Sequence, residues 1–427
     1  ERKEVDYPLP YVRWTEQRNL QEFLHLVAAG KVRLAPLITH RFSIDEAERV
    51  YDLIQQGKEK YIAVLLTYPE TQASLAPRVE LRVPAVRAPA DAVRLGVIGA
   101  GLFANTTLLP VLKGMPGVVL RGIATASGFT GQHAGCKFGF EYCTTDYRQI
   151  LEDPEIDGVL ILTRHNLHAR MVVDALHAGK HVFVEKPLAL STDELRQVVT
   201  AYEPNPRILM VGFNRRFSPF TRRARELMSR TGPLFIHCRV NAGPVPRDSW
   251  VVDADEGGGR ILGEVCHFVD LAGYLAGANP VLVYTAGLRD GSGKVSADDV
   301  SVTLNLADGS VAQIGYVARG DKAFSRERVE IFGGGSVCVI DDFRRLVYVG
   351  GGRRRSMAAL NVDRGHKAEM EEFISAVAGR REPPVPFEDY VATTMATIAA
   401  QDSLFRGIPV HIELAELLAA SGGHQGQ

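Results

Sequence analysis

Hydrophobic and polar positions follow two successive patterns along the chain, and the first predicts a parallel sheet. The apolar runs that follow residue 92 are short and lie at 93–98, 118–124, 158–162, 181–184 and 208–212. Between them lie stretches with a helical period, at 102–113, 167–178 and 192–202. Such alternation of apolar strands and helices predicts a doubly wound α/β Rossmann domain. The first of these helices has to accommodate Pro110.

From residue 234 onward the pattern changes, because one predicted helix at 261–276 is followed by strands without helices between them. The strand-like runs lie at 281–289, 299–306, 311–318, 328–333, 336–340 and 345–349. Asp308-Gly309 and the glycines at 333–335 are hairpin signals. We therefore predict an α+β domain with a large, mostly antiparallel open sheet. Helices at 367–378 and 388–404 close the chain, and we expect them to pack back on the Rossmann domain.

The first ninety residues predict a small α/β appendage and a linker. A helix over 19–29 ends at Gly30, and Ser43 and Glu46 form a capping box for a second helix that ends at Gly57. Residues 61–66 are typical of a buried strand, and a Pro- and Ala-rich stretch with a short strand at 79–83 follows. The predicted domains are the appendage, the linker, the cofactor-binding domain and the domain for substrate binding and oligomerisation, at 1–69, 70–92, 93–213 and 214–427.

Composition narrows the class of protein. The apolar fraction of 46% is ordinary for a globular protein, and a formal charge of -1 favours neither nucleic acid nor an anionic membrane. Five cysteines without a C-x-x-C pair indicate reduced thiols, so we expect a cytoplasmic protein with neither a disulfide framework nor a metal site. The chain begins Glu-Arg-Lys-Glu, without an initiating Met or an apolar signal segment, as a fragment or a processed chain would.

The segment Gly-Ala-Gly-Leu-Phe-Ala at 99–104 follows a predicted strand and opens a helix. Its first glycine permits a tight turn, its second lets backbone approach a pyrophosphate, and the final alanine lets the helix pack closely on the strand. Free N–H groups at the start of the helix favour phosphate. We predict a dinucleotide site; a tight turn that binds nothing is the less favoured alternative. The predicted cofactor contacts are Gly99, Gly101, Leu102, Phe103 and Ala104.

The choice between NAD and NADP stays open. An acid about 20 residues after the glycine loop usually binds the ribose 2′-hydroxyl of NAD. The corresponding strand ends at 124–128, where neither an acid nor an adjacent arginine occurs. We predict NAD or NADP as the cofactor, with Ser127 among its contacts.

Glu185-Lys186-Pro187 ends another strand of the same predicted sheet, at the edge where α/β folds bind ligands. A lysine at this edge is able to orient a substrate oxygen by a charged hydrogen bond, and the Lys186-Pro187 bond is a candidate for cis geometry. Most lysines lie on the surface, so this tripeptide alone does not decide the role of Lys186.

Four segments carry a family resemblance. They are VRLGVIGAGLFA (93–104), VLILTRHNLHARMVVDALHAGKHVFVEKPLAL (159–190), GFNRRFSP (212–219) and GGGRILGEVCHFVDLAGYLAG (257–277). Together they resemble the glucose–fructose oxidoreductase, inositol dehydrogenase and rhizopine-catabolism (Gfo/Idh/MocA) family over about residues 93–415. The Glu-Lys-Pro tripeptide is the most specific match.

The resemblance implies catalytic roles. Lys186, with Glu185 beside it, contacts substrate and nicotinamide, and His267 is the general base, a task that suits an imidazole pKa of about 6.5. Many family members have an aspartate four residues before this histidine, where this chain has Gly263. Glu264 is three residues from His267 and could meet it on one helix face, so whether Glu264 replaces the aspartate is open.

The remaining implied contacts lie in both domains. Thr163, Arg164 and His168 match positions near the cofactor, with Arg164 where many members have proline; His168 fits a buried structural histidine almost as well. Arg216 matches an arginine that recurs after the last Rossmann strand. Further residues at positions that line the substrate site of relatives are Arg247, Trp250 and Arg260, although a solvated surface role suits each of these two arginines at least as well.

Residues 31–69 resemble the C-terminal end of a zinc-type, medium-chain alcohol dehydrogenase. The phosphate-binding glycines and zinc ligands of such a domain lie upstream of this region and are absent from the chain. We therefore predict an inactive remnant that packs on the second domain or mediates assembly. Fusions of this kind occur in bacterial polysaccharide gene clusters.

The predicted function is hydride transfer between a nicotinamide and a carbinol carbon of a sugar, cyclitol or nucleotide sugar, in a homodimer or homotetramer. The alternative is a cofactor-binding but catalytically silent regulatory or assembly module, which the missing aspartate favours. A third hypothesis is hydrolysis with a retained redox cofactor, as in some family members.

Overall fold

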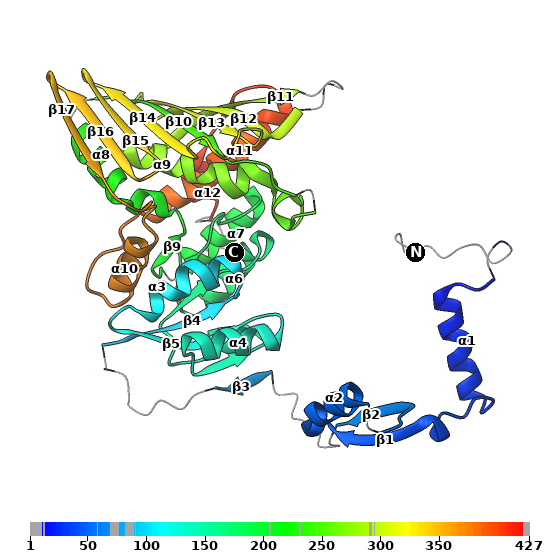
Figure 1. Cartoon of the computed structure of the whole chain (residues 1–427). Helices are drawn as coiled ribbons and strands as arrows, with labels where there is room; N and C mark the ends of the chain where they lie inside the picture. Colours follow the sequence, from blue (N-terminus) through cyan, green and yellow to red (C-terminus); the bar gives the residue numbers. More distant parts are fainter. Residues whose placement is uncertain are drawn as a thin grey trace, which may run out of the picture. The chain divides into compact units, whose positions relative to one another are not determined.

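The computed structural model describes residues 11, 13–57, 59–68, 77–81, 89, 91–204, 206–229, 232–246, 248–289, 293 and 295–421. The chain divides into two compact units, 1–75 and 76–427, and each is described by itself. Figure 1 shows the elements of both units, coloured along the sequence.

The N-terminal unit has a two-stranded parallel sheet. Helix α1 (Glu16–Ala28) begins at Thr15, whose hydroxyl accepts a bond from the Arg18 N–H, and it buries no residue. The predicted capping box of Ser43 and Glu46 is confirmed. Val50 is the one buried apolar residue in the described part of this unit. The other elements are η1 (Ala35–Leu37), β1 (Ile38–Ser43), η2 (Ile44–Glu46), α2 (Ala47–Gln56) and β2 (Ala63–Thr67).

The second unit begins with a seven-stranded sheet whose neighbours are parallel, except that β3 runs antiparallel to β6. The predicted Rossmann fold is confirmed. Strand β6 was not predicted, and the strand expected at 79–83 is found at 78–80, inside the stretch interpreted as a linker. The sheet order is β3 (Arg78–Glu80), β6 (Tyr142–Thr144), β5 (Val118–Ala124), β4 (Val93–Ile98), β7 (Gly158–Ile161), β8 (His181–Val184) and β9 (Leu209–Val211).

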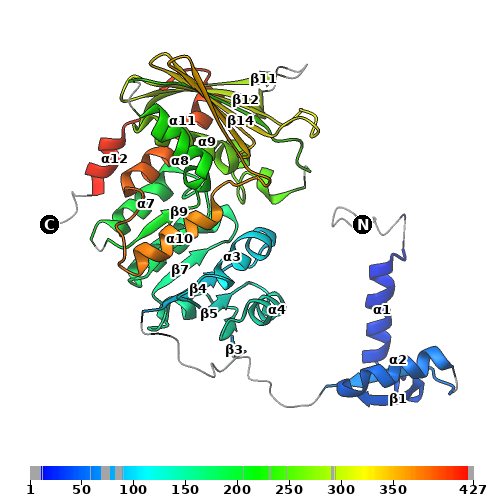
Figure 2. The same ribbon diagram turned by 60° about the vertical axis from the view of Figure 1, so that its left-hand side comes forward.

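Helices follow these strands in turn (Figure 2). The predicted helix over 102–113 contains a π turn, in which the Leu109 N–H bonds the Ala104 carbonyl, and Pro110 lies at the junction that follows. Such turns commonly accommodate a local break in helical hydrogen bonding. The helices are η3 (Ala104–Leu108), α3 (Leu109–Lys113), α4 (Gly128–Phe138), α5 (Arg148–Glu152), η4 (His165–Leu167), α6 (His168–His177) and α7 (Thr192–Tyr202).

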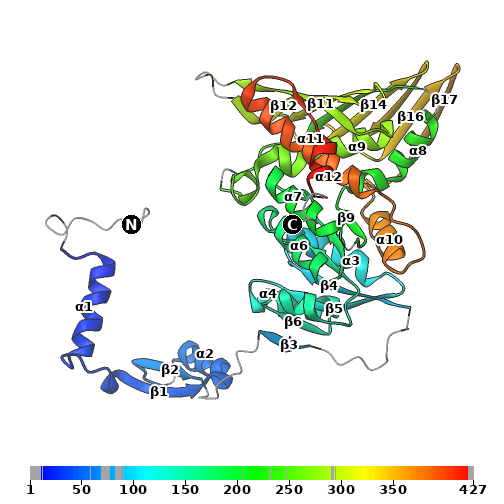
Figure 3. The same ribbon diagram turned by 180° about the vertical axis from the view of Figure 1, so that it is seen from behind.

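A nine-stranded sheet forms the rest of the unit, and apart from the parallel pair β10–β13 its neighbours are antiparallel, as predicted. Helices α8 (Pro219–Met228), α9 (Cys266–Ala276) and α11 (Phe387–Arg406) lie along one face, and no described helix covers the other (Figure 3). The sheet order is β17 (Arg353–Ala358), β16 (Arg345–Gly350), β15 (Ser336–Asp341), β14 (Glu327–Gly333), β10 (Phe235–Asn241), β13 (Val311–Val317), β12 (Val295–Leu306), β11 (Pro280–Arg289) and β18 (Val410–His411).

The last helices return to the Rossmann strands. Met370 and Phe373 of α10 (His366–Val377) and Tyr390 of α11 are buried in the same hydrophobic core as these strands. Phe373 packs edge-on against Phe183 of β8, with 5.8 Å between ring centroids. Helix α12 (Leu414–Ser421) packs on α7. The two sheets therefore share one packed body.

A single turn, η5 (Asn214–Phe217), joins the two sheets by buried ion pairs. Nε and Nη2 of Arg215 donate to the two oxygens of Glu327 on β14, each at 3.0 Å. Arg216 donates to both oxygens of Asp270 on α9, with its Nε 3.0 Å from Oδ2. All four residues are buried. Removal of either acid would leave a guanidinium charge in the interior.

The described ranges hold no helix that is both long and apolar enough to cross a membrane. In the same ranges, no three His, Cys, Asp or Glu side chains come together as metal ligands would. The five cysteines are free.

Asp270→Asn tests how much the joint at 214–217 stabilises the fold. The variant keeps the shape of the side chain but leaves the charge of Arg216 with the more distant Asp389, at 3.9 Å, as its remaining acid partner among the described residues. The free energy of unfolding should therefore fall by about 3–5 kcal/mol. Urea denaturation followed by circular dichroism measures the change. In the control Asp402→Asn, the lost partner is the exposed Arg406 of the same helix, and the expected loss is below about 1 kcal/mol. Equal losses would contradict a stabilising role for the joint.

Candidate active site

The loop between β4 and η3 has the geometry of a dinucleotide turn. Gly99 has a φ of +102°, and a Cβ there would lie 2.5 Å from the Leu162 carbonyl oxygen, so this position requires glycine. A Cβ on Gly101 would meet nothing within 4 Å, which leaves open space beside the loop. The loop leads directly into a helix, whose first N–H groups suit phosphate. These residues fit a nicotinamide dinucleotide.

The other predicted cofactor contacts differ in their surroundings. Leu102 is exposed, and Ala104 is buried against the sheet. The ring of Phe103 packs on His366 of α10, with 5.7 Å between centroids. Ser127 is exposed at the end of β5. Their contacts with a cofactor stay predictions.

Lys186 lies at the end of β8 and reaches the second domain. The predicted cis bond between Lys186 and Pro187 is confirmed. Nζ of Lys186 donates to the Gly263 carbonyl and lies 3.3 Å from Oε1 of Glu264. Although burial raises the pKa of Glu264, Lys186 and two arginines lower it to about 2; burial lowers the pKa of Lys186, but Glu264 raises it above its ordinary value. The two side chains therefore form an ion pair at neutral pH.

His267 and Glu264 do not form the pair that their spacing allowed. The segment η7 (Ile261–Val265) is a π turn, which changes the direction of residue 264 relative to α9. Glu264 faces Lys186, and no hydrogen bond joins it to His267, whose Nδ1 is buried without a partner among the described residues. Burial, Arg215 and Lys186 hold the pKa of His267 well below its ordinary value. Its imidazole is therefore neutral.

His168 and Thr163 hold two loops of the site together. The fully buried ring of His168 places Nδ1 2.8 Å from the Pro187 carbonyl oxygen and Nε2 3.2 Å from that of Thr163. Burial lowers the pKa of His168 to about 4, so a neutral ring donates to one of these carbonyls. This gives His168 the structural role that was one of its two interpretations, and a cofactor contact stays a prediction.

Arg164 and Trp250 meet in a contact between the loop after β7 and residues 250–259. Arg164 forms an ion pair with Glu256, and its guanidinium lies 6.0 Å from the Trp250 ring centroid. The Asn166 N–H also donates to the Glu256 carbonyl at 3.1 Å. The structure therefore brings together these two predicted residues, which come from different domains.

His165 was not among the predicted residues. Its ring is buried, with Nδ1 2.7 Å from the Gly257 carbonyl oxygen. A Cβ on Gly263 would lie 3.0 Å from Cε1 of His165, so the lack of a side chain at 263 makes room for the imidazole. Burial and Lys186 lower the pKa of His165 to about 3. In the sequence, its position in the loop that follows β7 was the one feature that could have marked His165 as a site residue.

The three arginines predicted to contact substrate differ in their surroundings. Arg216 is buried on Asp270. Arg260 is buried over the Tyr316 ring, 5.1 Å from its centroid, so the surface role considered for it is wrong. Arg247 lies outside the described residues. Substrate contacts for these arginines stay predictions.

Glu185 is an acid whose pKa lies near neutrality. Its carboxylate packs on Gly212 at the end of β9, where a Cβ would lie 2.8 Å from Oε1. Burial raises the pKa of Glu185 to about 7, although Lys186 lowers it. Glu369 of α10 is buried without a partner for either oxygen among the described residues, and burial and Glu185 raise its pKa well above the ordinary value. Glu185 therefore titrates near neutral pH, one residue from Lys186.

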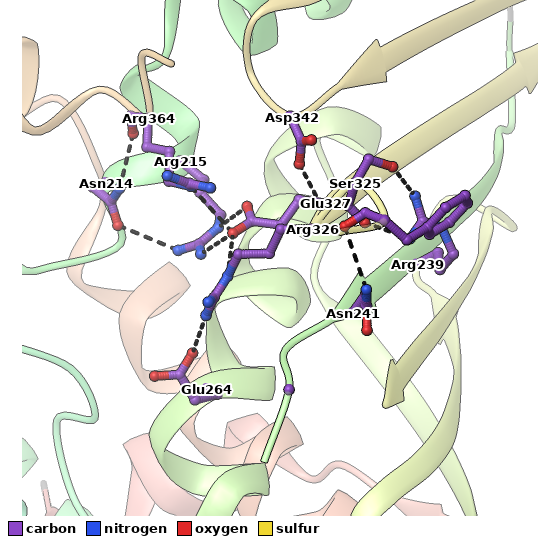
Figure 4. Close-up of polar contacts among 12 residues, drawn as sticks. Asn214, Arg215, Arg239, Asn241, Glu264, Ser325, Arg326, Glu327, Asp342 and Arg364 are labelled. Atoms are coloured by element: carbon purple, nitrogen blue, oxygen red, sulfur yellow. Dashed lines mark hydrogen bonds and ion pairs between the residues drawn. The ribbon is translucent and has the colours of Figure 1, made fainter. Parts of the chain in front are cut away.

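Arg326 is a second residue that was not predicted. Its Nη2 lies 3.9 Å from Oε2 of Glu264, and its Nε lies 3.4 Å from Oε1 of Glu327 (Figure 4). No local pattern marks it, because its place depends on β14 lying beside the turn that carries Glu264.

Comparison with known proteins connects both halves of the second unit to one family. Residues 93–213 match the oxidoreductase family with an NAD-binding Rossmann fold (GFO/IDH/MocA), and residues 232–335 match the GFO/IDH/MocA C-terminal domain.

The relatives match over nearly their whole length. The myo-inositol 2-dehydrogenase of Thermotoga maritima is 28% identical over 334 residues, which are 75% of this chain and 99% of that protein. The scyllo-inositol 2-dehydrogenase (NAD(+)) of Bacillus subtilis is 24% identical over 349 residues, 75% of this chain and 97% of that protein. A solved levoglucosan dehydrogenase, in complex with NADH and levoglucosan, shares the fold with a TM-score of 0.66 at 23% identity, over 75% of this chain and 99% of that one.

Glu185→Gln should change how stability depends on pH. The unfolded chain loses this proton near the ordinary pKa of 4.5, whereas the folded chain keeps it up to about 7. Between these values a rising pH favours the unfolded state, so the wild-type free energy of unfolding should fall relative to that of the neutral variant. Urea denaturation at about pH 4.5, 6 and 7.5 measures the difference. Glu371→Gln, on the exposed side of α10, is the control; parallel pH profiles for wild type and Glu185→Gln would contradict the assignment.

Proposed function

We propose a function from the family to which this chain belongs, the Gfo/Idh/MocA oxidoreductases: it transfers a hydride between a nicotinamide and a carbinol carbon of a sugar, cyclitol or nucleotide sugar. The observation that carries the proposal is the Lys186 ammonium, held by Glu264 at the carboxyl edge of the sheet that bears the Gly99 loop. Ligands of α/β sheets bind at this edge. Inositols and levoglucosan, named for relatives, are polyhydroxylated rings and support this substrate class.

The chain's own residues would orient the substrate and move a proton. A dinucleotide along residues 99–104 would supply the hydride acceptor or donor. Lys186 would donate a charged hydrogen bond to the substrate oxygen and stabilise the negative charge that develops as its proton leaves. Neutral His267 would accept that proton. Because its lowered pKa makes His267 a weak base, the stabilisation of the oxygen by Lys186 is what would make the transfer favourable.

We infer NAD rather than NADP as the cofactor. The matching family is described as NAD-binding. Residues 124–128, at the end of β5, carry no lysine or arginine for a 2′-phosphate. The hydroxyl of Thr125 donates to the Ser127 carbonyl at 2.7 Å and holds this turn in place. A turn of small hydroxyl-bearing residues suits a ribose hydroxyl better than a phosphate dianion.

We also propose that the N-terminal unit is related to the C-terminal end of a zinc-type alcohol dehydrogenase. Its strands β1 and β2 are parallel neighbours, as in a Rossmann sheet. A parallel sheet normally has both faces covered, yet the described part of this unit buries one apolar residue, Val50. Such a unit needs a packing partner.

The nine-stranded sheet supports the proposed homo-oligomer. Exposed apolar side chains lie on the face of the sheet opposite its buried side chains, and they are Phe235, Tyr284, Val317, Phe332 and Val349. Large exposed apolar side chains on a sheet face without a covering helix suit an interface between copies of the chain.

Light scattering should find a dimer or a larger assembly. Tyr284→Glu with Phe332→Glu should shift it toward the monomer, because two charges would be buried in the interface. The control Phe324→Glu changes an exposed phenylalanine in the loop before β14. A monomeric wild-type chain at about 10 μM, well above the Kd of a stable interface, would exclude this assembly.

Lys186→Ala should abolish turnover and preserve cofactor binding, because the ammonium acts on the substrate oxygen. Fluorescence titration with NADH measures binding, and absorbance at the nicotinamide band measures turnover on a panel of inositols, sugars and nucleotide sugars. We expect a rate lower by about a hundredfold or more. The control Lys367→Ala removes an exposed lysine of α10. An unchanged rate in Lys186→Ala would contradict the catalytic role of Lys186. If the wild-type chain binds NADH but turns over none of the panel, the catalytically silent alternative is favoured.

A further inference from the structure

Three arginines converge on one buried carboxylate at the junction of the two sheets. Arg215 binds both oxygens of Glu327 at 3.0 Å, and Nε of Arg364 donates to Oε1 at 3.1 Å (Figure 4). Nε of Arg326 lies 3.4 Å from the same oxygen. One carboxylate balances one of these charges, so positive charge is in excess around Glu327.

Arg326 is the arginine of this group that is open to a ligand. Its side chain is 48% exposed, against 7% for Arg215 and 27% for Arg364. Its Nη2 lies 3.9 Å from Oε2 of Glu264, beyond hydrogen-bonding distance. Lys186 lies closer to Glu264, at 3.3 Å, and is its main counterion. The Nη nitrogens of Arg326 can therefore donate hydrogen bonds to a ligand. The Glu264 carboxylate lies between them and Lys186.

The chain holds Arg326 in place before any ligand binds. The Asn241 N–H of β10 donates to the Arg326 carbonyl at 2.7 Å, and the Asn241 side chain donates to the Asp321 carbonyl at 2.6 Å. Arg239, on the same strand, donates to the carbonyl and the hydroxyl of Ser325 at 2.8 and 2.7 Å (Figure 4). Because this loop is already ordered, binding costs little conformational entropy there.

The charges around Lys186 favour an anion. The cations are Lys186, Arg215, Arg326 and Arg364, and the fully ionised acids that face them are Glu264 and Glu327. Glu185, beside Lys186, has a pKa of about 7 and is only partly ionised at neutral pH. Burial lowers the pKa of His267, and Arg215, Lys186 and Arg326 each lower it further. The effect of these three cations on His267 agrees with an excess of positive charge in the site.

Arg326 shares both of its acid partners with other cations, Glu327 with Arg215 and Arg364 and Glu264 with Lys186. Partly desolvated cations that share a counterion are incompletely compensated, and an anionic ligand would add the missing negative charge.

We propose that Arg326 binds the carboxylate or phosphate of an anionic sugar or cyclitol, whose reacting hydroxyl then lies at Lys186. The planar guanidinium matches both groups by paired hydrogen bonds. This inference rests on the proposed function and narrows its substrate class. Arg326 is then a specificity-determining residue for that class.

Calorimetric titration of the NADH-saturated chain tests the inference, since no sugar oxidation takes place with the reduced cofactor. The probes are D-glucuronate and D-glucose 6-phosphate, which carry their charge at the same position, with neutral D-glucose as the reference. We expect at least one anionic sugar to bind about tenfold or more tightly than glucose. The tighter of the two identifies carboxylate or phosphate as the preferred group. Raised salt should weaken this preference.

Arg326→Gln should remove the preference for the anionic sugar and leave NADH affinity unchanged. Arg326→Lys keeps the positive charge but lacks the paired N–H groups of the guanidinium, so this variant should retain part of the preference for the anionic sugar. The lysine variant therefore tests the inference even if Arg326→Gln is unstable. The matched control is Arg328→Gln. It removes the same charge two residues after Arg326, from a side chain that is paired with Glu330. Equal wild-type affinities for the three sugars, no binding of either anionic sugar, or a preference that survives Arg326→Gln would each overturn the inference. These measurements need no turnover, so they are independent of a failure of the proposed function.

Discussion

The site depends on the two buried arginines of the turn at 214–217. A buried guanidinium is tolerated when its counterion meets it with good geometry and remaining donors are satisfied. Arg215 meets Glu327 on β14, and Arg216 meets Asp270 on α9. The turn follows directly from the last Rossmann strand, so these pairs fix the second domain against the carboxyl edge of the Rossmann sheet. The groups that the second domain brings to this edge, Glu264 and His267 among them, depend on that joint together with the contacts of Lys186 and the loop after β7.

The same charges set the protonation states in the site. The cations around Glu264 keep it ionised, and with burial they keep His267 neutral. Glu185 is held back from ionising by burial and retains its proton to about neutral pH. An ammonium, a neutral imidazole and a titrating carboxyl therefore lie near one edge of the sheet. This combination suits the removal of a proton from a hydroxyl group while the developing oxyanion is stabilised.

Elements with strong local patterns were predicted well, and elements that depend on distant partners were not. The apolar strands at 93–98, 118–124 and 181–184 were found at these positions, because burial on both faces leaves a continuous apolar run. Strand β6 has three residues, too few for a pattern. Strand β10 alternates buried and partly buried positions after its exposed first residue, but it lies between β13 and β14, which follow it at a distance of about 70 residues or more along the chain. Its place in the sheet required the whole domain.

By itself the sequence determined what depends on local conformation: a glycine at 99, where a side chain would strike backbone, and a proline after Lys186, which made a cis bond at the end of a strand a candidate that the structure confirms. The tertiary structure decided which side chains meet. Spacing allowed Glu264 to pair with His267, but a π turn and the packing of the domains directed it to Lys186, 78 residues away. His165 and Arg326 likewise belong to the site because of contacts with residues that are distant in the sequence. Contacts across such separations depend on how two domains pack, and neighbouring residues along the chain carry no record of that packing.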